Sequence, residues 1–278
     1  MKLGFSTWAM PDLPIETSIK HIANLGYDGI TIAVLPRFST SLDTLDTARR
    51  KHIKKLTKEN DLPISSVMSF TSMLEENPSE LEKNIKMVKE SIRLAVDWDT
   101  PYVITGIGGE PGDLENPEKL KKLIERLENI GNFASSEGIT VALEPHVGQA
   151  TETPDQLTQL LDKIQSPSIK VNFDISHFNV LGIPMKESVD KVLPYSVLID
   201  VKDERGIVPD WEFVAPGEGE FNYVEFIKTL DSFAYDGFVT VEISFMVQKR
   251  SNYDPLDVTS KSFDVLNSAF KTAGVRRT

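Results

Sequence analysis

The strongest constraint on the fold of this chain is a regular alternation of two kinds of segment. Segments of helical periodicity, such as the one in which Leu81, Ile85, Val88 and Ile92 recur at steps of three and four, separate eight short β-branched or apolar runs. The runs cover residues 2–6, 29–35, 64–70, 102–107, 140–144, 169–174, 197–203 and 238–244. Because the chain must cross back through a helix before each new strand, the alternation predicts parallel strands.

Two architectures satisfy this alternation, a closed barrel and a doubly wound open sheet. Eight strand–helix units in 278 residues match a (β/α)₈ TIM barrel, for which about 250 residues is typical. A doubly wound sheet commonly carries a glycine-rich phosphate turn after its first strand, and here that strand runs into Ser6, Thr7 and Trp8 instead. We therefore expect an α/β protein with one TIM-barrel domain covering residues 1–278.

Charge and composition exclude several classes of partner. The formal net charge of −12 works against phosphate backbones and anionic membrane surfaces, so we expect no nucleic-acid and no membrane partner. The absence of cysteine removes disulfides and thiolate metal sites. No signal peptide is visible at the start, and no apolar run approaches the roughly 20 residues of a membrane helix, so we expect a cytoplasmic protein.

Four acidic residues share one phase of the last four predicted strands. In strands where alternate apolar residues face the helices, the remaining positions point into the barrel, near the strand ends where barrel active sites form. These positions include Glu144, Asp174, Asp200 and Glu242. Carboxylates crowded this closely must be protonated or share a cation, and oxygen ligands favour a divalent ion. Helix capping, or pairing with a lysine, is the alternative for each acid taken singly.

Five short motifs make the sequence similar to a known family. The segments VALEPH, VNFDISHF, DVKD, PGEGEF and VTVEIS, in this order, resemble the xylose isomerase-like TIM-barrel superfamily, over essentially the whole chain. That superfamily contains sugar isomerases, ketose 3-epimerases and inosose dehydratases. In its epimerases one divalent metal is bound by four strand-end residues, and the resemblance implies that the metal ligands here are Glu144, Asp174, Asp200 and Glu242. It also implies that Glu144 and Glu242 are the catalytic pair that removes and returns a proton.

Position 200 departs from the family pattern. The family usually has histidine in the motif H-x-K-D, whereas this chain has Asp200. A carboxylate there makes the ligand set all oxygen, which favours Mn²⁺ or Mg²⁺ and leaves Co²⁺ or Zn²⁺ as alternatives. A weakened or repurposed metal site is the other interpretation of the same substitution.

Several further residues are candidates for substrate binding. The resemblance implies that His177 contacts substrate or metal, and His146 follows directly after Glu144-Pro145 on the same face. Lys202 points inward beside Asp200, where it either orients a substrate hydroxyl or pairs with a carboxylate. Arg205 lies in the loop after the seventh strand, and Trp8, just beyond the first strand, either stacks on a sugar or packs in the core.

The leading functional hypothesis is a divalent-metal-dependent sugar isomerase or epimerase. Such an enzyme moves a proton next to a carbonyl group through an enediolate held by the metal, on a small-molecule sugar or polyol ketone. The first alternative is a dehydratase or other lyase acting on an inosose or 3-keto sugar, since the same apparatus can expel a β-hydroxyl group. The second is a non-catalytic barrel that acts as a partner subunit. A homo-oligomer is an expectation from the resemblance alone.

Overall fold

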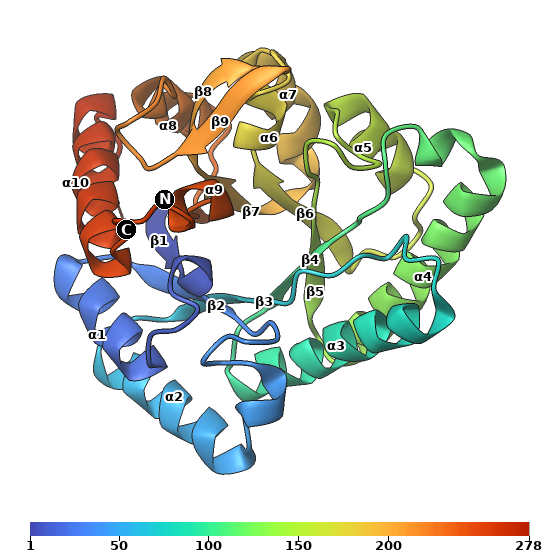
Figure 1. Cartoon of the computed structure of the whole chain (residues 1–278), viewed down its shortest axis with the longest axis horizontal. Helices are drawn as coiled ribbons and strands as arrows, with labels where there is room; N and C mark the ends of the chain where they lie inside the picture. Colours follow the sequence, from blue (N-terminus) through green and yellow to red (C-terminus); the bar gives the residue numbers. More distant parts are fainter. Residues whose placement is uncertain (278) are drawn as a thin grey trace.

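Eight parallel strands close into a barrel in the structure, which is a computed structural model describing residues 1–277. Figure 1 shows the strands at the centre of the molecule and the helices around them. Around the barrel the strands follow the order β1 (Lys2–Ser6), β10 (Phe238–Val241), β7 (Ser196–Val201), β6 (Ile169–Asp174), β5 (Thr140–Glu144), β4 (Tyr102–Gly106), β3 (Ile64–Met68) and β2 (Gly29–Ala33). The parallel pairing of β1 with both β10 and β2 closes the ring, so the predicted (β/α)₈ TIM barrel is confirmed.

Helices connect consecutive strands, and two of the longest begin at an Asn-Pro pair. The side chains of Asn77 and Asn116 accept hydrogen bonds from the first backbone N–H groups of their helices, each ahead of a proline. The main helices are α1 (Ile15–Leu25), α2 (Thr47–Glu59), α3 (Pro78–Asp97), α4 (Pro117–Ser136), α5 (Pro154–Leu161), α7 (Met185–Val192), α8 (Tyr223–Ser232) and α10 (Pro255–Ala273). No helix within residues 1–277 combines the length and the apolar character needed to span a bilayer.

The strands separate two apolar layers, as the predicted alternation requires. The inner layer fills the barrel with Ala33, Met68, Ile104, Ala142 and Leu198. Side chains of the opposite phase, among them those of Val141, Leu143, Val171 and Phe173, belong to the larger core between strands and helices. The inward phase of β5, β6, β7 and β10 is therefore the one that carries the acidic residues.

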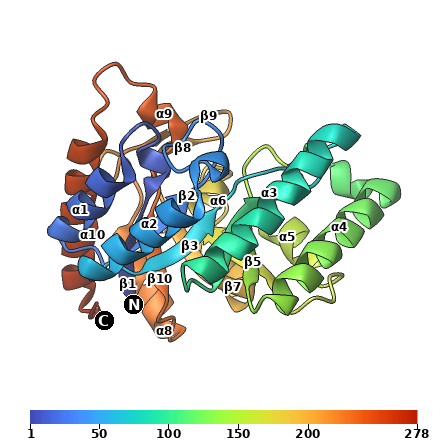
Figure 2. The ribbon, with the colours of Figure 1, turned by 90° about the horizontal axis from the view of Figure 1, so that it is seen from below.

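Two details of the sequence interpretation need correction. The strands predicted to run to positions 35, 70, 203 and 244 end earlier, at Ala33, Met68, Val201 and Val241. The segment after the seventh strand is not a plain loop, because it forms an antiparallel hairpin of β8 (Asp203–Ile207) and β9 (Asp210–Val214). This hairpin lies outside the barrel; its outer part, residues 205–212, is exposed or half-buried, and its base, with Glu204 and Phe213, is buried. Figure 2 shows the hairpin and the short helix α9 (Phe245–Gln248) at one end of the barrel, with both chain termini at the other.

Candidate active site

The four acidic residues lie together at the carboxyl ends of neighbouring strands. Glu144 ends β5, Asp174 ends β6, Asp200 is the penultimate residue of β7, and Glu242 directly follows β10. Asp174 and Asp200 are register partners, so they stand at the same height in the barrel wall. All four side chains are buried, the most accessible being Glu242 at 6% exposure.

Three of these carboxylates form one compact group. One oxygen from each of Glu144, Asp200 and Glu242 lies within 4.8 Å of the others. The side-chain amide of Asn172 donates to Oε2 of Glu144 at 3.0 Å and to Oδ2 of Asp200 at 2.8 Å, which fixes the orientation of both. The other oxygen of Asp200, Oδ1, is buried and has no hydrogen-bond partner among the residues that the structure describes. This oxygen is free to bind a ligand.

Burial and mutual repulsion oppose ionisation of this group. Burial raises the pKa of Glu144 and of Asp200 well above its usual range, and the neighbouring charge of Glu242 adds to both shifts. Burial also raises the pKa of Glu242. A cation would remove this penalty, and the donors on offer are carboxylate oxygens, which suit a hard divalent ion. The residues present therefore fit a divalent metal ion, with Glu144, Asp200 and Glu242 as the residues that could hold it.

Asp174 stands apart from this group because Lys202 neutralises it. The ammonium group of Lys202 contacts the Asp174 carboxylate and lies 2.8 Å from Oε1 of Glu242. Although burial disfavours its charged form, the carboxylates of Asp174, Glu242 and Glu144 raise the pKa of Lys202 well above its usual range. Of the two alternatives for Lys202, the ion pair with carboxylates is present. Asp174 also accepts hydrogen bonds from the backbone and hydroxyl of Ser176 on its other carboxylate oxygen.

Two stacked histidines flank the carboxylates. The rings of His146 and His177 lie 3.9 Å apart, and burial lowers the pKa of both, so both imidazoles are neutral near pH 7. His177 Nε2 lies 3.8 Å from Oε1 of Glu144 and 3.6 Å from Oδ2 of Asp174. Its Nδ1 is buried without a hydrogen-bond partner in the described part of the chain, so it can bind a polar group of a ligand. Glu144, Asp174 and His177 make a second possible metal-binding group.

The two remaining candidates for substrate binding, Trp8 and Arg205, lie in different places. The indole of Trp8 packs against Phe38 at 5.7 Å and Phe70 at 6.5 Å between ring centroids, and Phe70 contacts His146 in turn. Trp8 thus belongs to a row of aromatic rings, the aromatic arc, which runs from the histidines through Phe70 to Trp8. Arg205 does not join the carboxylates, because its guanidinium donates to the backbone carbonyl of Glu218 on the exposed hairpin side. Substrate contact by either residue stays a prediction.

Three residues at this site were not singled out from the sequence. Asn172 could have been found, because it shares the inward phase of its strand with Asp174. Phe213 packs its ring edge-on against His177 at 5.1 Å, but its place depends on the unpredicted hairpin. Glu204, its cross-strand partner, is buried, and burial raises its pKa to about 8. No local sequence signal marks a buried acid on a largely exposed hairpin.

Comparison with known proteins gives the same family over most of the chain. The chain is 25% identical over 255 residues to fructoselysine 3-epimerase of Shigella flexneri, covering 88% of this chain and 91% of that protein. It is 24% identical over 276 residues to inosose dehydratase of Bacillus thuringiensis, covering 87% and 89%.

A solved structure with the same fold carries a metal. A xylose isomerase-like TIM-barrel protein from Mycobacterium smegmatis, in complex with magnesium, superposes with a TM-score of 0.74 at 19% identity. The superposition covers 98% of this chain and 97% of that one. The family model of the xylose isomerase-like TIM barrel matches residues 19–269. The chain therefore belongs to the xylose isomerase-like TIM-barrel family.

Proposed function

We propose that this protein is a divalent-metal-dependent epimerase or isomerase acting on a ketose or a related polyol ketone. The observation that carries the proposal is the compact group of Glu144, Asp200 and Glu242, buried at the mouth of the barrel. Similarity to an epimerase over 88% of the chain supports the same class of chemistry.

The reaction requires a base on the carbon next to the carbonyl and an acid that returns the proton. Glu144 and Glu242 project from strands on different sides of the site, with β6 and β7 between them around the barrel. One of them takes the proton, the electron pair of the broken C–H bond moves toward the carbonyl oxygen, and the other returns a proton to the opposite face.

A divalent ion would be held by Glu144, Asp200 and Glu242, with Asp174 as a further predicted ligand. It would supply a Lewis acid for the oxygen on which negative charge develops. Asn172 keeps the Glu144 and Asp200 carboxylates facing one another, and the unpartnered Oδ1 of Asp200 supports this assignment.

The substrate hydroxyls meet neutral hydrogen-bonding groups on the other side of the site. We assign His177 Nδ1 to one of these hydroxyls, because this nitrogen is buried and otherwise unpartnered in the described residues. The aromatic arc of Phe213, Phe70 and Trp8 offers flat apolar surfaces of the kind on which sugar rings stack.

Deuterium exchange tests the proposal. Purified protein is incubated with Mn²⁺ or Mg²⁺ and a panel of ketoses in deuterated water, and deuterium is located by NMR. We expect deuterium on the carbon next to the carbonyl of at least one ketose, and much slower incorporation with the Glu144→Gln variant. No incorporation with any sugar and either metal would refute the proposal.

Dehydration is the second candidate, favoured by the similarity to inosose dehydratase. A substrate with a hydroxyl group β to the carbonyl would lose it after the same proton removal, and the product would absorb as an enone. Appearance of that absorbance with an inosose, without exchange into ketoses, would assign the protein to this class. Absence of both reactions together with no metal binding would favour a non-catalytic barrel.

A further inference from the structure

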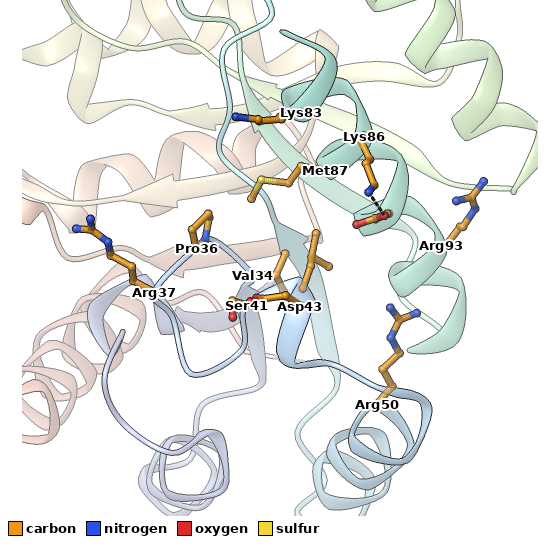
Figure 3. Close-up of a pocket in the computed structure, with 12 residues that line it drawn as sticks. Val34, Pro36, Arg37, Ser41, Asp43, Arg50, Lys83, Lys86, Met87 and Arg93 are labelled. Carbon is orange, nitrogen blue, oxygen red and sulfur yellow. Dashed lines mark ion pairs between the residues drawn. The ribbon is translucent and has the colours of Figure 1, made fainter. Parts of the chain in front are cut away.

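A cavity lies between the loop after β2 and helix α3. Its volume is about 750 Å³, within the range of small-molecule sites. Figure 3 shows α3 along one side, the β2–α2 loop opposite, and Arg50 of α2 pointing toward the gap. Apolar residues Val34, Pro36, Leu42 and Met87 contribute to its lining.

The lining has the opposite charge to the rest of the molecule. Five cationic side chains and two carboxylates line the cavity, in a chain whose net charge is −12. The cations are Arg37, Arg50, Lys83, Lys86 and Arg93, and the carboxylates are Asp43 and Glu90. A local reversal of sign of this kind attracts an anion to one place on an otherwise repelling surface.

The two lysine ion pairs at this cavity are open to competition, whereas Arg50 is held by Asp97 at 2.8 Å and by the carbonyl of Leu45. Lys86 lies 3.7 Å from Glu90, and Lys83 lies 2.7 Å from Glu80, with both lysine side chains at least two-thirds exposed. Exposed pairs of this kind contribute little to stability. A phosphate dianion carries twice the charge of a carboxylate and three acceptor oxygens, so it can replace the carboxylate as partner.

The backbone of Arg37 has an unusual conformation. Its φ is +72°, a left-handed conformation that a side chain disfavours and that glycine adopts readily. The loop holds it there through hydrogen bonds from Phe38 N to the carbonyl of Leu35 and from Ser39 N to the carbonyl of Pro11. The guanidinium has no carboxylate partner within residues 1–277. A strained, exposed and unpaired arginine at a cavity wall points to a ligand.

We propose that this cavity binds a small organic phosphate, with its phosphoryl group among Arg37, Lys83 and Lys86 and its carbon skeleton over Val34 and Met87. The site is separate from the carboxylate group at the barrel mouth and does not depend on the proposed function. The same β2–α2 loop that carries Arg37 packs Phe38 against Trp8 of the aromatic arc.

Calorimetric titration in 150 mM NaCl tests the proposal with glucose 6-phosphate, glucose and inorganic phosphate as probes. We expect saturable binding of glucose 6-phosphate, weaker binding of phosphate, and none of glucose. Arg37→Gly should weaken glucose 6-phosphate binding about tenfold while leaving the melting temperature unchanged or higher, because it removes the guanidinium and the backbone strain together. Glu90→Gln should tighten binding about threefold by releasing Lys86.

Lys55→Gln is the matched control, since Lys55 is exposed on α2, loses the same charge and does not line the cavity. It should change the affinity less than about twofold. Three results would overturn the proposal: no saturation below about 10 mM glucose 6-phosphate, equal binding of inorganic phosphate, or equal effects of Arg37→Gly and Lys55→Gln.

Discussion

The ammonium nitrogen of Lys202 lies 2.8 Å from Oε1 of Glu242 in the interior of the site. The same nitrogen contacts Asp174, so one fixed cation serves two of the four buried acids. Glu144 and Asp200 both accept hydrogen bonds from the neutral amide of Asn172. One positive charge against four carboxylates leaves an excess of negative charge, and this excess is what a divalent ion would balance.

Removal of Lys202 tests how much of the site depends on that cation. Lys202→Met should lower the free energy of unfolding in EDTA by about 3 kcal/mol, because it leaves buried carboxylates without their partner. Addition of Mn²⁺ should raise the melting temperature of the variant more than that of the wild type, since the ion replaces the lost charge. Lys186→Met is the control, because Lys186 forms an exposed pair with Asp190 and its loss should be almost silent. Equal melting temperatures of the two variants in EDTA would contradict the structure of this pair.

The barrel was predictable because strand alternation has a period of two and is readable from any buried strand. Val141 and Leu143 face the helices, so Glu144 must face inward, and register then brings it near Asp200. The position of Lys202 was not predictable in this way. Whether its flexible stem turns toward Asp174 or toward a substrate depends on the local electric field, which sequence phase does not contain.

The hairpin of β8 and β9 is a second feature that could not be predicted from the sequence. Asp203–Ile207 and Asp210–Val214 pair only with each other, outside the barrel, so no core-facing pattern marks them. Phe213 and Glu204 reach the site through this hairpin, whose formation the sequence pattern does not predict. The largely exposed surface of the hairpin hides a buried face that only tertiary packing reveals.

Metal binding should depend on Asp200 in both strength and selectivity. Asp200→Asn should weaken Mn²⁺ binding at least about tenfold, since it removes one charged oxygen ligand. Asp200→His, which restores the usual family residue, should shift the preference toward Zn²⁺ or Co²⁺, because imidazole suits these ions better. Both changes are measurable by calorimetry without any substrate. Glu212→Gln, on the exposed strand β9, is the control for loss of one negative charge.

The two glutamates should be separable by exchange kinetics. Glu144→Gln and Glu242→Gln should each lower kcat by a factor of about 10²–10⁴, the usual contribution of a positioned acid or base. Because the two carboxylates serve opposite faces of the carbon, each variant should retain some deuterium exchange from one epimer only. Mass spectrometry of each pure epimer in deuterated water measures this. Loss of exchange from both epimers in one variant alone would mean that a single residue serves both faces.

Glu204 should make stability depend on pH. Burial, with the nearby charges of Asp203 and Asp174, raises its pKa to about 8 in the folded protein, whereas an unfolded glutamate has a pKa of about 4.5. Below pH 4.5 both states hold the proton and Glu204 has no effect on stability. Between pH 4.5 and 8 the unfolded chain releases the proton while the folded protein keeps it, so stability falls as the pH rises.

Glu204→Gln should remove that dependence. Glutamine keeps an oxygen for the hydrogen bond that Asn179 donates at 2.9 Å, and it has no proton to lose. The variant should match the wild type near pH 4.5 and exceed it near pH 8 by about 2 kcal/mol, less than the roughly 5 kcal/mol of the full pKa difference because a buried acid relaxes toward solvent. Urea unfolding at several pH values measures this difference.

Glu212→Gln, on the same hairpin but exposed, should show no such trend. A constant difference between wild type and Glu204→Gln across this range would mean that Glu204 is already ionised in the folded protein, stabilised by a partner other than Asn179.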